Sequence, residues 1–359
     1  MTIRLAKPAI TPSMSAMLGA ALGMLLSAWG PYLGAASGPI ADTLVVPMIP
    51  SGRQEQPQLF RMNPDGTGLT QLTRAAGVGA PTDANDFPVL ARDRKTLLFA
   101  SGRAFPPSAT SHNFNPMLRM AYRMDPAGGE ARRLTGLDPQ HYLEYPNDLA
   151  PDGSWAVLAV VNDGTDVPAP IAGLSKLYRA NLDGSACAML IPDDALSRSE
   201  ANLGCAVFTG DGGTLVFVAD GPAQACELWK LDLATSRTTQ LTHEADRGRK
   251  VAWRMPMVAP DDGSIYCLSQ KNDYSAMALE RIRLDGTGGT EVLGIPKEPG
   301  SGAFTLDFFA LAPDGNALVC SQRSGSMNEK VVTMGMDGKD ARILYPTARF
   351  VGWGGIAWR

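Results

Sequence analysis

The chain has 359 residues, of which 45% are apolar and 19% are charged, and its formal net charge is -4. A mildly acidic chain with thinly spread Lys and Arg gives no electrostatic basis for binding nucleic acid. Its 38 glycines and 27 prolines fall between strand-like apolar runs, which indicates turns and argues against disorder.

The first predicted element is a secretory signal peptide over residues 1–36. Arg4 and Lys7 form a short positive region, an apolar run rich in Met, Ala, Leu and Gly follows, and small residues lead to a cleavage site near Ala36. An uncleaved membrane anchor is the alternative, because the apolar stretch approaches the roughly 20 residues that span a bilayer. In either case we expect a periplasmic or secreted protein, with a linker over residues 37–42.

From residue 43 onward one phrase recurs six times, and each copy has a short apolar run, a tight polar turn and a second apolar run. The copies are LFRMNPDGTGLTQLT from Leu59, AYRMDPAGGEARRLT from Ala121, LYRANLDGSACAMLI from Leu177, LWKLDLATSRTTQLT from Leu228, LERIRLDGTGGTEVL from Leu279 and VVTMGMDGKDARIL from Val331. Each reads as a β-hairpin, since Gly accepts positive φ and Asp hydrogen-bonds its own backbone. A fixed repeat of this kind indicates units that stack on one another.

A second hairpin lies upstream of most copies and turns on its own Asp-Gly pair. These turns lie at Asp152, Asp211, Asp262 and Asp314, with Asp93 as an altered copy. Each repeat therefore contains four short strands, which is typical of a blade of a β-propeller. The sequence predicts an all-β, six-bladed propeller of four-stranded antiparallel blades over residues 43–359.

The chain ends complete this count. The first copy has only one strand before it, Thr43 to Met48, and the residues from Gly354 to Trp358 read as an isolated inner strand. Pairing of these N- and C-terminal strands closes the ring and removes an exposed strand edge.

The repeat resembles the PD40 repeat of TolB-like propellers, which has an inner strand ending in Ser-Pro-Asp-Gly and an outer hairpin that turns on Asp-Gly before Leu-Thr. Matching segments are Ala-Pro-Asp-Gly at 150–153 and 312–315, Ala-Pro-Asp-Asp-Gly at 259–263 and Gln-Leu-Thr at 71–73 and 240–242. The resemblance covers about residues 43–358 and implies the fold. It implies no single function, because this fold carries many.

Polar residues recur near the starts of the predicted inner strands, which line the axial channel of a propeller. They are Asn85-Asp86, Asn147-Asp148, Asn202, Trp253-Arg254 and Asp307. From these we predict a ligand site at the channel mouth, made by Asp86, Asn147, Asp148, Arg254 and Asp307, that holds a polar ligand, ordered water or a divalent cation. The alternative is that these side chains cap free backbone groups.

Metal-assisted chemistry has weaker support. The three histidines, His112, His141 and His243, all fall in loops and could converge with Glu144 or Glu244 on a metal. No HExxH or HxH spacing occurs, and no Gly-x-Ser-x-Gly elbow is present.

The five cysteines are Cys187, Cys205, Cys226, Cys267 and Cys320, and none forms a Cys-x-x-Cys pair. Cys205 and Cys226 could form a disulfide in an oxidising compartment. The alternative is that all five are small buried apolar residues.

A regular repeat without a catalytic motif favours an exported, monomeric, non-enzymatic protein that binds a protein partner or a cell-envelope glycan through its loop face and channel. One alternative is a metal-assisted oligosaccharide lyase or hydrolase of the oligogalacturonate type on the same face. A second is a TolB-like envelope scaffold.

Overall fold

A computed structural model describes the part of the chain that the repeats occupy. The described residues are 42–50, 56–74, 84–105, 118–162, 174–192, 196, 202–220, 226–243, 251–271, 277–295, 304–324, 327–345, 348–351 and 355–359. They belong to one unit that spans Ala41–Arg359. The predicted signal peptide and nearly all of the linker lie outside the described residues, so both stay predictions.

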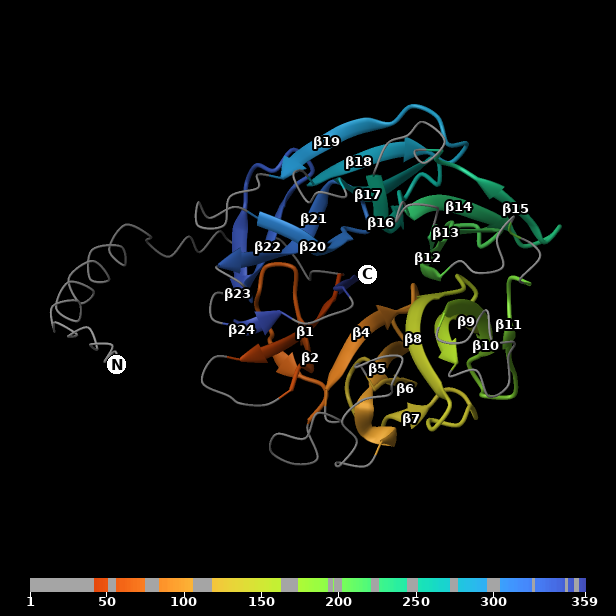
Figure 1. Ribbon diagram of the computed structural model, residues 1–359. Coiled ribbons are helices and arrows are strands. Elements are labelled where there is room, and N and C mark those ends of the chain that lie inside the picture. The colour runs from red at the N-terminus through yellow and green to blue at the C-terminus, as the bar shows by residue number, and fades with distance from the viewer. Residues whose placement is uncertain are drawn as a thin grey trace, which may run out of the picture. The chain divides into compact units, whose positions relative to one another are not determined.

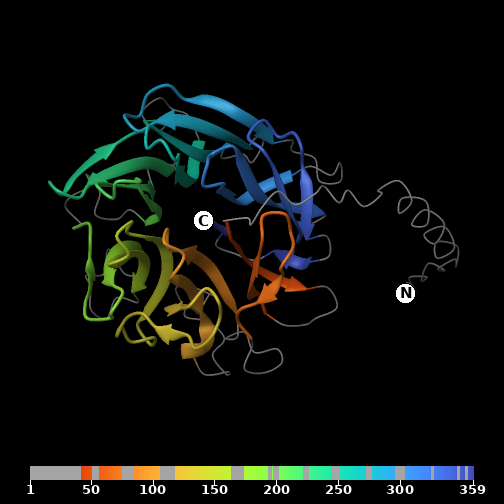
Figure 2. The ribbon, with the colours of Figure 1, turned by 180° about the vertical axis from the view of Figure 1, so that it is seen from behind.

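The described residues form β-strands and one short 3-10 turn, η2 (Gly102–Ala104), with no α-helix among them. Within this part of the chain, no helix has the length and apolar character needed to cross a bilayer. The sheets of Ala41–Arg359 surround a common centre, where the C-terminus lies (Figure 1). The view from behind shows the same arrangement (Figure 2). The all-β expectation is confirmed.

Two antiparallel four-stranded sheets follow each other in the first half of the chain. The first contains β4 (Asn85–Leu90), β5 (Leu97–Ser101), β6 (Met120–Met124) and β7 (Arg132–Arg133). The second contains β8 (Tyr142–Leu149), β9 (Trp155–Asn162), β10 (Ser175–Asn181) and β11 (Cys187–Met189). In both, sequential strands are neighbours, as the hairpin repeat predicts.

The second half repeats this pattern. One four-stranded group contains β12 (Leu203–Phe208), β13 (Thr214–Asp220), β14 (Cys226–Asp232) and β15 (Arg237–Gln240). The next contains β16 (Val251–Val258), β17 (Ser264–Lys271), β18 (Met277–Arg283) and β19 (Thr290–Ile295). A single parallel pair, Cys226 with Ala252, joins these two groups into one eight-stranded sheet. The last sheet contains β20 (Phe304–Leu311), β21 (Ala317–Ser324), β22 (Met327–Gly335) and β23 (Arg342–Tyr345).

The remaining sheet combines both ends of the described chain. It contains β1 (Leu44–Pro50), β2 (Gln58–Met62), β3 (Thr70–Gln71), β24 (Ala348–Val351) and β25 (Ala357–Trp358). Strand β1 pairs with β2 on one side and with both β24 and β25 on the other. Thr43 N–H donates to Arg359 O at 2.6 Å, and Arg359 N–H donates to Thr43 O at 3.1 Å. The pairing expected from residues 43–48 and 354–358 is therefore present.

The Asp-Gly turns have a structural role. In the outer turns, Asp65 Oδ1 accepts the N–H of Thr67 at 2.9 Å and Asp285 Oδ1 accepts that of Thr287 at 2.8 Å. The inner turn at Asp152 repeats this bond with Ser154. Hydrogen bonding from Thr67 also lowers the pKa of Asp65. These are Asx turns on the surface, and their side chains serve their own backbone.

The threonine of the Leu-Thr motif is structural as well. Thr73 and Thr242 are both buried. The hydroxyl of Thr242 accepts the N–H of Leu228 at 2.9 Å and donates to Glu227. Thr73 makes the same pair of bonds with Leu59 N–H and Gln58. Each threonine thus joins the end of an outer strand to the strand beside it.

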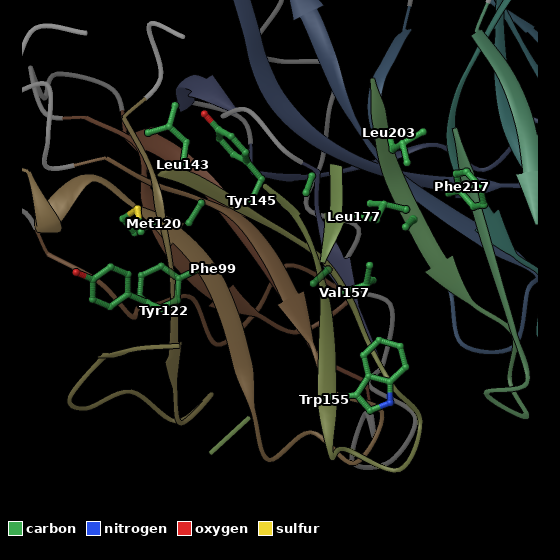
Figure 3. Close-up of a cluster of buried hydrophobic side chains, with 14 of the residues drawn as sticks. Phe99, Met120, Tyr122, Leu143, Tyr145, Trp155, Val157, Leu177, Leu203 and Phe217 are labelled. Carbon is green, nitrogen blue, oxygen red and sulfur yellow. The ribbon is translucent and has the colours of Figure 1, made fainter. Parts of the chain in front are cut away.

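Apolar side chains fill the space between neighbouring sheets. Figure 3 shows one such cluster, in which Phe99, Leu143, Trp155 and Phe217 come from consecutive sheets. Another cluster joins the N-terminal and the last sheets, where Val46 and Trp358 pack with Val319. Sheets that meet face to face in this way make a core that runs around the centre.

Glycines in the outer turns let neighbouring sheets approach. Gly286 has φ +86, and a Cβ at this residue would lie 2.5 Å from Leu241 O. Gly66 has φ +85, and its Cβ would lie 2.8 Å from Leu344 O. The contact between the last sheet and the N-terminal sheet therefore has the same form as a contact between sheets that are consecutive in sequence.

Candidate functional site: an axial cavity

A cavity of about 480 Å³ lies among the first strands of the sheets. Five of these strands and the C-terminal segment line it, through Phe87, Pro88, Val89 and Leu90 of β4, Tyr145–Asp148 of β8, Gly204–Phe208 of β12, Met255–Val258 of β16, Phe308 and Phe309 of β20 and Gly355–Arg359. Most of these side chains are apolar. A volume of this size is within the range of about 300–1,000 Å³ that small-molecule sites occupy.

Each of the five strands carries a β-bulge where it lines the cavity. The pairing register shifts between Asp86 and Val89, between Pro146 and Asp148, between Gly204 and Val207, between Arg254 and Met257, and between Phe304 and Phe309. Three non-glycine residues there have left-handed backbones: Phe87 (φ 52), Cys205 (φ 50) and Met255 (φ 51). Such conformations cost of order 1–3 kcal/mol each and cluster at binding sites.

The predicted ligand residues do not share one level along the axis. Asp86, Arg254 and Asp307 each stand four residues before the last residue of their strand. Asn147 and Asp148 stand two residues and one residue before Leu149, the last residue of β8. At the level of Asp86, β8 has Tyr145 and β12 has Gly204. Of the four predicted residues whose side chains the structure describes, Asn147 and Asp148 line the cavity, and Asp86 and Arg254 do not.

Asp86 is engaged in a buried ion pair. Its side chain is 0% exposed, and its two carboxylate oxygens accept from Nε and Nη2 of Arg119, each at 2.8 Å. Burial raises the pKa of Asp86, and the facing guanidinium opposes that shift. Both carboxylate oxygens are occupied by the bidentate guanidinium.

Asn147 and Asp148 connect the sheet of β8 to β12. Asn147 Oδ1 accepts the N–H of Ala206 at 2.8 Å, and Asp148 Oδ2 accepts the N–H of Phe208 at 2.9 Å. Asp148 Oδ1 also accepts the N–H of Leu149 and lies 3.5 Å from Nη2 of Arg359. These bonds give both side chains a backbone-capping role, which was the alternative that the sequence left open.

The other polar residues at the strand starts make similar links. Asn202 Nδ2 donates to Asp220 at 2.8 Å, and its Oδ1 accepts the N–H of Ser175. Asn85 Nδ2 donates to Gln58 at 2.9 Å. Arg254 is exposed and directly precedes Met255. Asp307 lies in β20, but its side chain is outside the described residues.

The histidines are distributed over different sheets. His141 is half-buried just before β8, whereas His243 is exposed after β15. His112 and Glu244 lie outside the described residues. Glu144 is buried, accepts the N–H of Ala121 at 2.9 Å and accepts from the Thr135 hydroxyl; burial raises its pKa. Among the residues placed by the structure, no three His, Cys, Asp or Glu side chains form a group that could hold a metal.

All five cysteines are free. Cys205 lies on β12 and Cys226 on β14, with β13 between them. Neighbouring strands are about 4.8 Å apart, so two cysteines separated by a whole strand exceed the Cα distance of at most about 7 Å that a disulfide allows. Burial raises the pKa of the Cys226 thiol to about 12 and also raises that of Cys205, so both are held as thiols.

Two arginines that line the cavity were not predicted from the sequence. Arg92 follows β4 and donates across the axis to the carbonyl oxygens of Thr209 and Gly210, both at 3.1 Å. Arg359 approaches Asp148 from the C-terminal segment. Counting back four residues from Ala91, Thr209 and Ala259, which begin the inner turns, places Phe87, Cys205 and Met255 at one level. This alignment can be found in the sequence, whereas the long-range contacts of Arg92 and Arg359 cannot.

No model of a known protein family matches the sequence, and no curated protein sequence matches it. Among solved structures, the chain is similar to TolB from Acinetobacter baumannii, with a TM-score of 0.62 at 14% identity over 95% of this chain and 71% of that chain. It is similar to oligogalacturonate lyase in complex with manganese, with a TM-score of 0.51 at 13% identity over 85% and 78% of the two chains. It is also similar to a chain of a nidogen–laminin complex, with a TM-score of 0.55 at 11% identity over 89% and 98%. At such identities the similarity shows the fold alone, and that fold is the TolB-like β-propeller.

Proposed function

We propose that the chain is an exported, monomeric binding or scaffold protein that recognises its partner through the loop face and the axial cavity of a closed six-bladed propeller. The proposed domains are a signal peptide or anchor over residues 1–36, a linker over 37–42 and the propeller over 43–359. The order of Arg4, Lys7 and the apolar run that follows supports export.

Two contacts support a closed ring of six blades. Strand β1 pairs with β24 and β25, so strands from both ends of the chain complete one sheet. The approach of Gly66 to Leu344 repeats the approach of Gly286 to Leu241. The eight-stranded sheet consists of two four-stranded groups joined by one residue pair, which supports counting it as two blades.

The observation that carries the binding proposal is the contrast between the repeats and the cavity. In the repeats, Asp65 bonds to a backbone N–H of its own turn and Thr242 bonds to the strand beside it, so these side chains hold the fold. The cavity has bulged strands and side chains that differ from sheet to sheet. Because its walls are mainly apolar, we favour a protein partner that inserts an apolar group over a glycan, whose hydroxyls would need many polar partners.

Photo-cross-linking in cells tests this proposal. We would replace the exposed Arg254, beside the cavity, with p-benzoyl-phenylalanine, and use the same replacement of the exposed Ala186 in an outer turn as the matched control. We expect one defined protein adduct from position 254 and none from position 186. An absence of adducts from 254, or the same adducts from both positions, would contradict recognition at the cavity.

The fold similarity to a manganese-bound oligogalacturonate lyase is the observation that favours the alternative, metal-assisted cleavage of acidic oligosaccharides. The purified full chain should be assayed with oligogalacturonate and Mn²⁺. Turnover that disappears in His141→Ala would replace the binding proposal with the lyase.

A further inference from the structure

We propose that the axial cavity binds a small carboxylate with an apolar body, with the carboxylate beside Arg359 and Arg92 and the apolar body along the bulged strands. This inference rests on the proposed binding function and names the chemistry that the cavity recognises.

The cavity has an apolar part far from the inner turns. The three left-handed residues Phe87, Cys205 and Met255 lie there at one level, three residues before the ends of their strands. Tyr145 stands against Phe87 with ring centroids 5.1 Å apart. The Cys205 side chain is exposed and its thiol pKa is raised, so it adds a weakly polar surface without charge. An aliphatic chain or ring is the group that such walls take out of water.

The charged residues that line the cavity lie at the other end, beside the inner turns. Arg92, Asp148 and Arg359 all line the cavity there. Arg92 donates to the carbonyl oxygens of Thr209 and Gly210, and Asp148 is the carboxylate that faces Arg359 among the described residues. The charged side chains that line the cavity are thus two guanidinium groups and one carboxylate, which favours an anionic group over a cationic one, although Asp211 lies near Arg92 and offsets part of its charge.

The guanidinium group of Arg359 can still donate hydrogen bonds to a ligand. Its Nη2 is 3.5 Å from Asp148, its Nη1 is 3.4 Å from Trp358 O, and its side chain is 29% exposed. Its Nε is buried and has no hydrogen-bond partner among the described residues. A carboxylate that accepts from Nε and one Nη atom forms the bidentate pair that guanidinium geometry favours. Asp148 would lose little, since it keeps its bonds from the Phe208 and Leu149 N–H groups.

Titration calorimetry on the purified full chain tests the proposal, with octanoate as the probe and octanol as its uncharged counterpart. The expected result is octanoate binding at least about tenfold tighter than octanol, a difference of about 1.4 kcal/mol. Arg359→Gln should lower octanoate affinity by about tenfold, and Ala159→Leu, which narrows the cavity, should weaken octanoate and octanol alike. The matched control is Arg132→Gln at an arginine that is 69% exposed and ion-paired with Glu130; this variant should bind octanoate as the wild type does.

A second set of titrations distinguishes two sources of an apolar carboxylate ligand, the C-terminus of a protein and a free acyl carboxylate. The dipeptide acetyl-Gly-Leu carries an apolar side chain next to a free carboxylate, and its amide lacks that charge. Tighter binding of the dipeptide acid than of octanoate identifies the C-terminus of a partner protein as the source; the reverse identifies a free acyl carboxylate.

Failure of both carboxylates to bind, equal binding of octanoate and octanol, or an equal loss in Arg132→Gln would overturn the inference. Thermal unfolding of each variant confirms that it is folded. A cross-link from position 254 that persists when no carboxylate binds would leave the proposed function standing and remove only this inference.

Discussion

The outer turns and the inner strands of this protein come from the same repeat, but they have diverged to different extents. In the outer turns, Asp65 and Asp285 make the same bond to a threonine N–H two residues later. In the inner strands, equivalent positions hold Phe87, Cys205 and Met255, with the same left-handed backbone and different side chains. Backbone geometry is thus kept in both regions, whereas side-chain chemistry is kept only in the turns.

This difference separates the groups that hold the fold from those that can recognise a ligand. Bonds from a side chain to its own backbone fix a turn and are satisfied locally. Left-handed bulges cost free energy, and the surrounding strands must supply the stabilisation that maintains them. Variation at the bulged positions that line the cavity therefore changes chemistry, whereas variation in the turns changes stability.

The largest effect should follow from removing residues 355–359. This deletion removes β25, its pairing with Leu44 and Val45, and the buried side chains of Ile356, Ala357 and Trp358. We expect loss of the cooperative thermal transition, because β1 would gain an open edge. Arg359→Gln, which leaves the strand in place, is the control. A truncated chain that melts like the intact one would contradict closure by these strands.

The next effect concerns the buried ion pair. Asp86→Ala leaves the Arg119 guanidinium buried without its partner, so the free energy of unfolding should fall by about 3–5 kcal/mol. Glu130→Ala removes an exposed partner of Arg132 and should change it by less than about 1 kcal/mol. Urea denaturation measures both. If Asp86→Ala were as stable as the control, Asp86 would return as a candidate ligand residue.

A glycine comparison sharpens the role of the outer turns. Gly286→Ala should cost about 2–4 kcal/mol, because a Cβ there adds a backbone clash with Leu241 O to the strain of positive φ. Gly153→Ala in an inner turn has a similar φ of +70 but nothing within 4 Å of the added Cβ, so about 1 kcal/mol is expected. Equal losses of stability would mean that the close approach between sheets is unimportant.

The smallest effect is a pH dependence. Burial raises the pKa of Glu144 above its ordinary value of 4.5, so the folded protein holds this proton more tightly than the unfolded chain. The stability from this group is complete below 4.5 and is lost as the pH rises through the raised pKa. In Glu144→Gln that loss should be absent, so the wild type should lose stability relative to the variant between acidic and neutral pH. A pH-independent difference in urea denaturation would show that Glu144 does not titrate in this way.

Much of the fold follows from local sequence. The Asp-Gly pairs and the Leu-Thr ends predict the hairpins, because each depends on bonds between residues close in sequence, such as Asp152 with Ser154. The pairing of residues 43–48 with the C-terminal strand was also predictable, since an unmatched strand at each end of a repeat needs a partner.

The candidate site was harder to predict from the sequence than the fold. Recurrence of Asp and Asn suggested one polar level, but a residue's level depends on its distance from the inner turn and on the bulge between them. Asp86 and Asp148 therefore fall at different levels. The contacts of Arg92 with Gly210 and of Arg359 with Asp148 join residues far apart in the chain, and no local pattern encodes them.

The most direct test measures octanoate affinity in two folded variants, one at the cavity wall and one at a threonine of the repeat. Ala159→Leu narrows the cavity, whereas Thr242→Val removes a buried structural hydroxyl that bonds to Leu228 and Glu227. We predict that Ala159→Leu lowers octanoate affinity, and that Thr242→Val lowers thermal stability with unchanged affinity. Affinity that falls in Thr242→Val but persists in Ala159→Leu would contradict the assignment of recognition to the cavity.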